Sequence, residues 1–360
     1  MSSRLRSARL ARSLSQRQLA ALAGVSRQAV AAVEAGRSEP SLRLALALAG
    51  VLGVGVEDLF AAESALPAIR AEPLAPLGRE GSRVALAPLA GRLVAVPLHA
   101  DAGVRSGFAP AGGLVGGPAG TVRPVGAIRP CVVVAGCDPA LSLLEAPLAL
   151  LDPPLGLLWR PCASAGALEL AARGMVHAAG THVRDHEGGT YNHRARERLG
   201  PSSRLLGFSS WRQGLVLRPD LDGRVTCVGD IAALGLRLAN REPGSEARAV
   251  LDRAAARDGV AVHELAGSSS EVHGHLQVAA AIASGLADAG VASEPAALAY
   301  GLAFVPLSTE RFDLAVPPVH ADAPEVRALT TVLGSPWLRG QLALIPGYDA
   351  TTCGVPAAGP

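Results

Sequence analysis

Arg27 and Gln28 are the residues whose types and positions best suit the reading of base edges in DNA. They follow Ser26 at the start of a predicted short helix over residues 26–34. An arginine pairs well with O6 and N7 of guanine, and a glutamine pairs with N6 and N7 of adenine. Gln16 and Ser26 lie where their side chains could hydrogen-bond phosphates and set the register on the duplex. The predicted DNA-binding set also contains two basic residues, Arg17 and Arg37.

A second group of polar residues lies where predicted strands of the C-terminal half turn into helices. A helix N-terminus presents free N–H groups and the positive end of its dipole, which together bind anions. Open α/β sheets bind their ligands at the carboxyl ends of the strands, where these turns lie. The predicted ligand-binding residues are Asp138, Ser164, Thr181, Tyr191, Arg212, Arg241, Ser245 and Arg248.

Asp138 is an unusual residue for an anion pocket, because its carboxylate would repel an anion. Two interpretations remain open. Asp138 caps the helix that follows it, or it receives hydrogen bonds from a ligand that carries donors. The second interpretation favours an organic, cofactor-like ligand over a bare oxyanion.

The segment from Thr181 to His193 places three histidines beside Asp185 and Glu187. His182 with His186 or Asp185 could converge on a metal ion, yet the spacing matches no tight metal-binding motif. A polar loop at the rim of a cleft explains the same residues. We therefore expect no metal site in this segment.

Glu271, His273 and His275 alternate through the start of another predicted helix. Two-residue steps in a helix turn side chains by about 200°, so these residues make poor joint ligands. Motifs of the GxSxG, GxxxxGK[ST] and HExxH types are absent from the sequence. The sequence thus predicts no metal, no cofactor and no enzymatic activity.

The stretch from Leu14 to Gly36 must position the DNA-reading residues, and its pattern is that of two short amphipathic helices. Ser15 is a suitable N-cap, and Gln18, three residues later, completes a capping box. Gly24 supplies the tight turn between the helices. The pattern predicts a helix-turn-helix.

This N-terminal region resembles the XRE, or lambda-repressor-like, family of DNA-binding domains over residues 3 to about 60. The resemblance rests on LSQ at Leu14, GVSR at Gly24, VEAGRSEPSL at Val33 and LGVGVEDLF at Leu52. It implies an all-α domain of five short helices and a structural ion pair between Arg9 and Glu34. A regulator of this family binds double-stranded DNA, commonly as a homodimer on two half-sites.

The charge of the chain is unevenly distributed. Residues 1–60 contain eight arginines and four acidic residues, although the net charge of all 360 residues is only +2. Such a local excess suggests binding to a polyanion. The five cysteines show no CxxC spacing, and no run of 18 apolar residues is present, so we expect a cytoplasmic protein without a membrane segment.

Domain boundaries are expected at changes in composition. Residues 1–62 form the predicted DNA-binding domain, and residues 63–130 form a linker with a small β segment near Val84 to Leu98. From residue 131 onwards, strands alternate with helices, which predicts a mainly parallel sheet with helices on both sides. This α/β domain is expected to span residues 131–350, followed by a tail over 351–360.

The α/β region resembles the type II periplasmic-binding-protein fold. More narrowly, it is similar to the PBP-like domain found on some XRE regulators and some molybdopterin molybdotransferases. The matching segments include VAGCDPALSLL at Val134, NREPGSEARAVLD at Asn240 and HLQVAAAIASGLADAG at His275. The resemblance implies a two-lobed substrate-binding domain with a cleft between the lobes.

These features together predict a multidomain, ligand-responsive transcriptional regulator. Its effector would be a molybdate-like oxyanion, a molybdopterin-related compound or another small organic ligand. One alternative is a DNA-binding regulator whose PBP-like domain serves protein interaction or oligomerisation without a ligand switch. A further alternative is an enzyme of molybdenum-cofactor metabolism.

Overall fold

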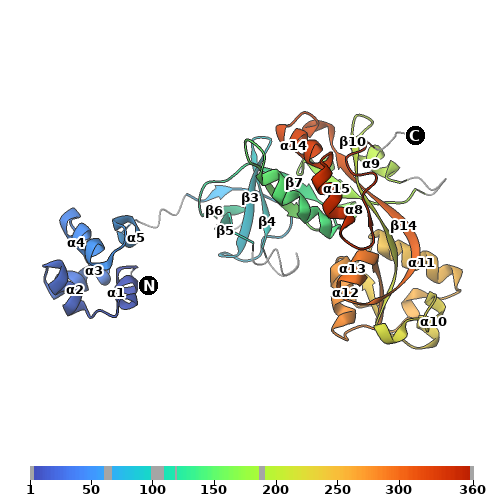
Figure 1. The fold of residues 1–360 in the computed structure, drawn as a ribbon, viewed down its shortest axis with the longest axis horizontal. Helices are drawn as coiled ribbons and strands as arrows, with labels where there is room; N and C mark the ends of the chain where they lie inside the picture. Colours follow the sequence, from blue (N-terminus) through green and yellow to red (C-terminus); the bar gives the residue numbers. More distant parts are fainter. Residues whose placement is uncertain (1–3, 61–66, 99–108, 118–119, 186–190, 357–360) are drawn as a thin grey trace. The chain divides into compact units, whose positions relative to one another are not determined.

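The computed structural model describes residues 4–60, 67–98, 109–117, 120–185 and 191–356. The chain divides into two compact units, residues 1–66 and 67–360, and each is described by itself (Figure 1). No helix in the described part of the chain is long and apolar enough to cross a membrane. His186 and Glu187 of the histidine-rich segment lie outside the described residues.

The N-terminal unit is all-α and contains five helices within its described residues, as the sequence predicts. Leu19, Val30 and Leu48 are fully buried at its centre, where three of the helices meet. The helices are α1 (Arg4–Ala11), α2 (Gln16–Ala23), α3 (Arg27–Glu34), α4 (Leu42–Leu52) and α5 (Val56–Phe60).

The ends of the two central helices follow the residues expected from the sequence. Ser15 caps α2, and its side chain and that of Gln18 form the complete capping box. Gly24 ends α2 in the left-handed region, at φ 67°, which a residue with a Cβ adopts only with strain. Ser26 caps α3 by accepting a hydrogen bond from the backbone N–H of Ala29. The helix-turn-helix is therefore fixed by local sequence.

The second unit begins with a six-stranded sheet in the order β1-β6-β5-β3-β4-β2. The first and last strands of this order, β1 and β2, are consecutive in the chain and are separated only by Ala71. The sheet therefore closes on itself around Val84, Ala95 and Val122. The two β runs predicted between Val84 and Leu98 are β3 and β4. The other four strands were not predicted, because strands as short as these give little periodicity. The strands are β1 (Ile69–Arg70), β2 (Glu72–Pro73), β3 (Arg83–Leu89), β4 (Arg92–Pro97), β5 (Gly113–Val115) and β6 (Thr121–Pro124).

The larger sheet has nine strands and is mixed rather than mainly parallel. Two parallel groups, β8-β7-β9 and β12-β11-β13, flank the long antiparallel pair β10 and β14, which also pair with these groups in antiparallel fashion. The strands are β7 (Cys131–Ala135), β8 (Gly156–Arg160), β9 (Ala178–Thr181), β10 (Arg204–Leu217), β11 (Leu238–Arg241), β12 (Glu271–Val272), β13 (Ala289–Ser293), β14 (Ala303–Val316) and β15 (Tyr348–Asp349).

Two lobes result, and β10 and β14 run through both of them (Figure 1). Lobe 1 contains η2 (Pro139–Leu144), α7 (Glu145–Ala149), α8 (Ser164–Ala172), α9 (His193–Leu199), η5 (Pro318–His320), α14 (Pro324–Leu333) and α15 (Pro336–Ala343). Lobe 2 contains η3 (Pro219–Leu221), α10 (Val228–Ala233), α11 (Glu246–Arg257), η4 (Val262–Glu264), α12 (His275–Ala283) and α13 (Glu294–Ala299). Separate apolar cores fill the two lobes.

The small β sheet belongs to the packing of lobe 1. Leu89 and Val94 of the small sheet share one apolar core with Val133 and Leu168 of lobe 1. Arg92 reinforces the contact by donating a hydrogen bond to the carbonyl oxygen of Gly174 at 2.7 Å. The β segment is therefore an integral layer of the second unit.

Candidate functional site

The first candidate surface is the start of α3 in the N-terminal unit. Ser26, Arg27 and Gln28 are all exposed there, as are Arg17 on α2 and Arg37 beyond the end of α3. Side chains at the first turn of a recognition helix can reach base edges in the major groove. The arrangement is chemically suited to DNA, although the contacts themselves stay a prediction.

Gln16 has a role inside the domain that its sequence position did not suggest. Its side-chain N–H donates to Glu34 Oε2 at 2.7 Å. Glu34 also accepts hydrogen bonds from Arg9 at 2.6 and 3.1 Å, which is the ion pair that the XRE resemblance implies. Burial alone would raise the pKa of Glu34, but the bonds from Arg9 and Gln16 outweigh it and lower that pKa.

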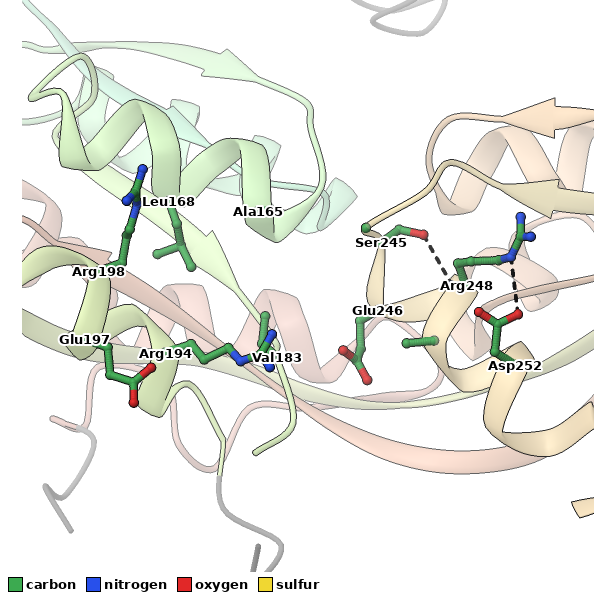
Figure 2. A pocket seen from close by; sticks show the side chains of 12 residues that line it. Ala165, Leu168, Val183, Arg194, Glu197, Arg198, Ser245, Glu246, Arg248 and Asp252 are labelled. Carbon is green, nitrogen blue, oxygen red and sulfur yellow. Dashed lines mark hydrogen bonds and ion pairs between the residues drawn. The ribbon is translucent and has the colours of Figure 1, made fainter. Parts of the chain in front are cut away.

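The second candidate site is a cleft of about 610 Å³ between the two lobes (Figure 2). Lobe 1 contributes α8 and α9, and lobe 2 contributes the first turns of α11. Of the predicted ligand-binding residues, Ser245 and Arg248 line this cleft. The lining residues are Ala165, Leu168, Val183, Arg194, Glu197, Arg198, Gly244, Ser245, Glu246, Arg248, Ala249 and Asp252.

The starts of α8 and α11 face each other across this cleft, with Ala165 opposite Ser245 (Figure 2). Ser245 caps α11 by accepting a hydrogen bond from the N–H of Arg248. Ser164, beside Ala165, is buried and accepts from the N–H of His182 at 3.3 Å. Both helix starts direct positive dipole ends at one space. Arg248 is paired with Asp252 at 3.3 Å, so the lining is close to charge balance.

Arg241, the last residue of β11, is buried. Its guanidinium binds Glu242 at 2.7 and 3.0 Å and lies 3.3 Å from Nδ1 of His275. Burial would raise the pKa of Glu242, but the neighbouring guanidinium lowers it overall. Arg241 is thus a neutralised cation that links β11 to α12.

Asp138 is fully buried and accepts four hydrogen bonds from protein groups. The donors are the N–H of Ala140, the hydroxyls of Tyr348 and Ser209, and the indole N–H of Trp211. Burial raises the pKa of Asp138, although each of these bonds opposes that rise. The arrangement favours the capping interpretation and leaves little capacity for a ligand with donors.

The remaining predicted residues lie outside the cleft lining. Arg212 is half exposed and forms an ion pair with Glu294. Thr181 is buried and donates to Oδ1 of Asn192. The Tyr191 hydroxyl donates to the carbonyl oxygen of Thr309, which anchors its loop to β14. None of the contacts of these three residues points to a ligand.

A buried cluster that the sequence did not reveal lies between the lobes. Sγ of Cys137 and one ring nitrogen each of His182 and His275 lie within 4.8 Å of one another. Cys137 follows β7 and His182 follows the neighbouring β9, whereas His275 begins α12 of lobe 2. The sequence separated the two histidines into different candidate groups, and only the sheet order brings them together.

The charges of this cluster are strongly coupled. Burial disfavours a charged His182, but the adjacent Cys137 and Glu310 outweigh it and raise the pKa of His182 to about 10. Burial, and then the positive charges of Arg241 and His182, lower the pKa of His275 well below its usual value. The cluster therefore shifts the pKa values of its two imidazoles in opposite directions.

Comparisons with known proteins agree with this architecture. The PBP superfamily domain model matches residues 146–334, and the helix-turn-helix model matches residues 5–59. An uncharacterized protein of Bacillus subtilis, YvgK, is 27% identical over 228 residues, covering 63% of this chain and 73% of that protein. An HTH-type transcriptional regulator of Methanocaldococcus jannaschii is 43% identical over 60 residues, covering 17% of this chain and 91% of that protein.

Among solved structures, the chain matches an ABC-type phosphate transport receptor from Vibrio cholerae and the effector-binding domain of QuiR in complex with shikimate. Their sequence identities are 12% and 10%, and their TM-scores are 0.39 and 0.42. They cover 60% and 57% of this chain, and 98% and 95% of their own. The chain belongs to the PBP-like family, within the PBP superfamily, and carries an N-terminal helix-turn-helix DNA-binding domain of the XRE type.

Proposed function

We propose that this chain is a ligand-responsive, one-component transcriptional regulator. The helix-turn-helix binds operator DNA, and the PBP-like domain binds a small effector between its lobes. The observation that supports this most strongly is the cleft of about 610 Å³ whose walls come from both lobes, α8 and α9 on one side and α11 on the other. A ligand in such a cleft favours the closed arrangement because it contacts both walls.

DNA recognition would depend on Arg27 and Gln28, with Arg17, Ser26 and Arg37 at phosphates. Gln16 would reach a phosphate only through atoms that its bond to Glu34 leaves available. Two base-reading side chains specify little sequence, so two copies on two half-sites are expected. Leu42 and Leu46, one turn apart on α4, are 73% and 55% exposed and offer an apolar surface for a homodimer. The protein would act in the cytoplasm, where the DNA is.

The effector would be a small anion or a small polar organic molecule. Two helix N-termini and Arg248 supply donors, while Glu246 and Asp252 supply acceptors at the same cleft. A molybdate-like oxyanion fits the donors, and an organic acid would use both kinds of group. We propose no catalytic role for this cleft.

Coupling requires that the effector bind one arrangement of the lobes more tightly than the other. A difference of about 1–3 kcal/mol would change operator affinity by roughly 5–150-fold. Whether the effector strengthens or weakens operator binding depends on which arrangement of the lobes holds the two DNA-binding units at the half-site spacing.

The experiment begins with a thermal-shift panel of molybdate, tungstate, sulfate and small organic acids against the full chain. Operator DNA is obtained by in vitro selection from random duplexes, and its affinity is measured by fluorescence anisotropy with and without each stabilising compound. The proposal predicts at least one compound that both stabilises the chain and shifts the operator affinity. Stabilisation without any shift would instead favour a PBP-like domain that does not switch DNA binding.

A further inference from the structure

The buried cluster between the lobes includes a carboxylate in addition to Cys137, His182 and His275. Glu310, on β14, is fully buried, and its Oε1 accepts a hydrogen bond from Ser308 at 2.6 Å. Its Oε2 lies 3.5 Å from Nδ1 of His182. Neither of these two atoms has a hydrogen-bond partner among the described residues. The two atoms are thus held close together in a buried site, in contact only as a long ion pair.

The separation of these two atoms suits a shared ion. Ligands at about 2.0–2.2 Å in tetrahedral geometry lie about 3.3 Å apart, close to the 3.5 Å between His182 Nδ1 and Glu310 Oε2. Cys137 Sγ lies within 4.8 Å of one ring nitrogen of His182 and one of His275, which places a sulfur donor beside this nitrogen and oxygen pair. Such a mixed set is typical of Zn²⁺ and related transition metals, whereas Mg²⁺ and Ca²⁺ prefer oxygen ligands alone.

The charge of the site also favours a divalent cation. A thiolate at Cys137 and the Glu310 carboxylate would place two negative charges in a region shielded from water, which is costly without compensation. The nearest buried guanidinium, that of Arg241, is already neutralised by Glu242. One divalent ion balances the thiolate and the carboxylate, and it takes the place of the proton on the ring nitrogen of His182.

His275 contributes a donor rather than a lone pair. Its Nδ1 accepts the backbone N–H of Ser293 at 3.2 Å and faces the guanidinium of Arg241. The proton of the neutral ring therefore lies on Nε2, which is buried and has no partner among the described residues. An N–H group cannot bind a metal ion, but it can donate to a thiolate or to an anionic ligand of the ion.

We propose that Cys137, His182 and Glu310 bind one transition-metal ion of the Zn²⁺ class. His275, from the opposite lobe, donates its Nε2–H to the Cys137 sulfur or to the fourth ligand of that ion. The ion thereby links lobe 2 to lobe 1 at β14, one of the two strands that run through both lobes. This inference goes beyond the proposed function, since it makes no use of DNA binding or of the cleft at α11.

Cobalt substitution tests the site directly. The full chain is freed of metal with a chelator and titrated with Co²⁺, whose visible bands report tetrahedral geometry and whose near-ultraviolet charge-transfer band reports a thiolate ligand. We expect one equivalent of Co²⁺ with both signals, and displacement of it by one equivalent of Zn²⁺. Cys137→Ser should remove the charge-transfer band, and His182→Gln and Glu310→Gln should each weaken binding by about a hundredfold or more, the upper end of losses seen for supporting residues.

Matched controls lie next to the proposed ligands. Cys162→Ser changes a partly buried cysteine at the end of the adjacent strand β8, and His273→Gln changes a histidine two residues from His275. Both variants should keep the cobalt spectrum. His275→Gln should keep the charge-transfer band but lose the extra thermal stability that the ion gives the wild-type chain. Variants are compared only where circular dichroism and the metal-free melting temperature match the wild type.

Three results would overturn the assignment: no Co²⁺ binding by the wild-type chain, a charge-transfer band that survives in Cys137→Ser, or its loss in His275→Gln. Stabilisation by an oxyanion with no response to Co²⁺ or Zn²⁺ would overturn it as well. The cobalt spectrum reports metal binding, whereas the operator affinity reports the proposed regulatory function. Failure of one proposal can therefore be distinguished from failure of the other.

Discussion

Glu34, the last residue of α3, accepts two hydrogen bonds from the guanidinium of Arg9 on α1, at 2.6 and 3.1 Å. Both side chains are more than nine-tenths buried. This bidentate pair therefore joins α3, the proposed recognition helix, to the first helix of the domain. Replacing one partner leaves the other as a buried group without compensation.

Glu34→Gln should destabilise the N-terminal unit by about 1–3 kcal/mol, because it removes the charge that Arg9 requires. Hydrogen exchange with mass spectrometry on the full chain should show amides of α1 and α3 exchanging about 5–150-fold faster. Glu39→Gln, at an exposed acidic position of the same unit, is the control and should leave exchange unchanged. Equal exchange in both variants would show that the pair contributes nothing to stability.

Arg27→Ala should reduce operator affinity by about 1–3 kcal/mol and relax the preference for one base pair, since a bidentate contact with guanine is lost. Arg37→Ala should weaken specific and scrambled duplexes equally and lower the salt slope of binding by about one. Anisotropy titrations at several salt concentrations separate the two effects. An unchanged specific-to-scrambled ratio for Arg27→Ala would exclude Arg27 as a base reader.

Arg248→Ala should weaken the effector-induced rise in melting temperature, because Arg248 lines the cleft. Arg212→Ala is its matched control. Arg212, on β10, is paired with Glu294 at the start of α13 and lies outside the lining, so its replacement should preserve the rise. If Arg212→Ala abolished the rise in melting temperature and Arg248→Ala did not, the effector site would lie on the other side of β10.

His177 should make the PBP-like domain acid-sensitive. Its Nδ1 accepts the backbone N–H of Val133, and burial, with the nearby His320, lowers its pKa from 6.5 to about 4. Between pH 6.5 and about 4, the unfolded chain therefore binds a proton at His177 more readily than the folded chain does. The stability contributed by the neutral ring is complete above pH 6.5 and is lost as the pH falls towards 4, by at most about 3 kcal/mol.

The measurement is urea unfolding at pH 7, 6 and 5, followed by the fluorescence of the three tryptophans, Trp159, Trp211 and Trp337. His177→Asn keeps an acceptor near Val133 but cannot titrate, so its stability should fall less with decreasing pH. His193→Asn, at an exposed histidine, should behave like the wild type. Parallel pH profiles for all three proteins would exclude His177 as the source.

Local sequence was sufficient to predict the helix-turn-helix, because caps such as Ser15 and Ser26 and the turn at Gly24 act within a few residues. It also indicated the α/β character of the second unit. The sequence could not show which face of β10 carries the side chain of Arg212, because alternate residues of a strand face opposite sides of the sheet. Trp211 and Gln213 are buried whereas Arg212 is exposed.

The cluster of Cys137, His182 and Glu310 was missed for a different reason. Cys137 follows β7, His182 follows β9 and Glu310 lies on β14. Their convergence therefore depends on the strand order β14-β9-β7. Neither composition nor spacing encodes that order. A cysteine at a strand end carries no signal until its neighbours in space are known.

The most direct test of the regulatory account is the operator affinity of the full chain, measured by anisotropy with and without a compound that stabilises the wild-type chain. The account predicts a change of roughly 5–150-fold that is lost in Arg248→Ala, while the affinity of that variant without the compound stays at the wild-type value. An operator affinity that is the same with and without a demonstrably bound compound would contradict it.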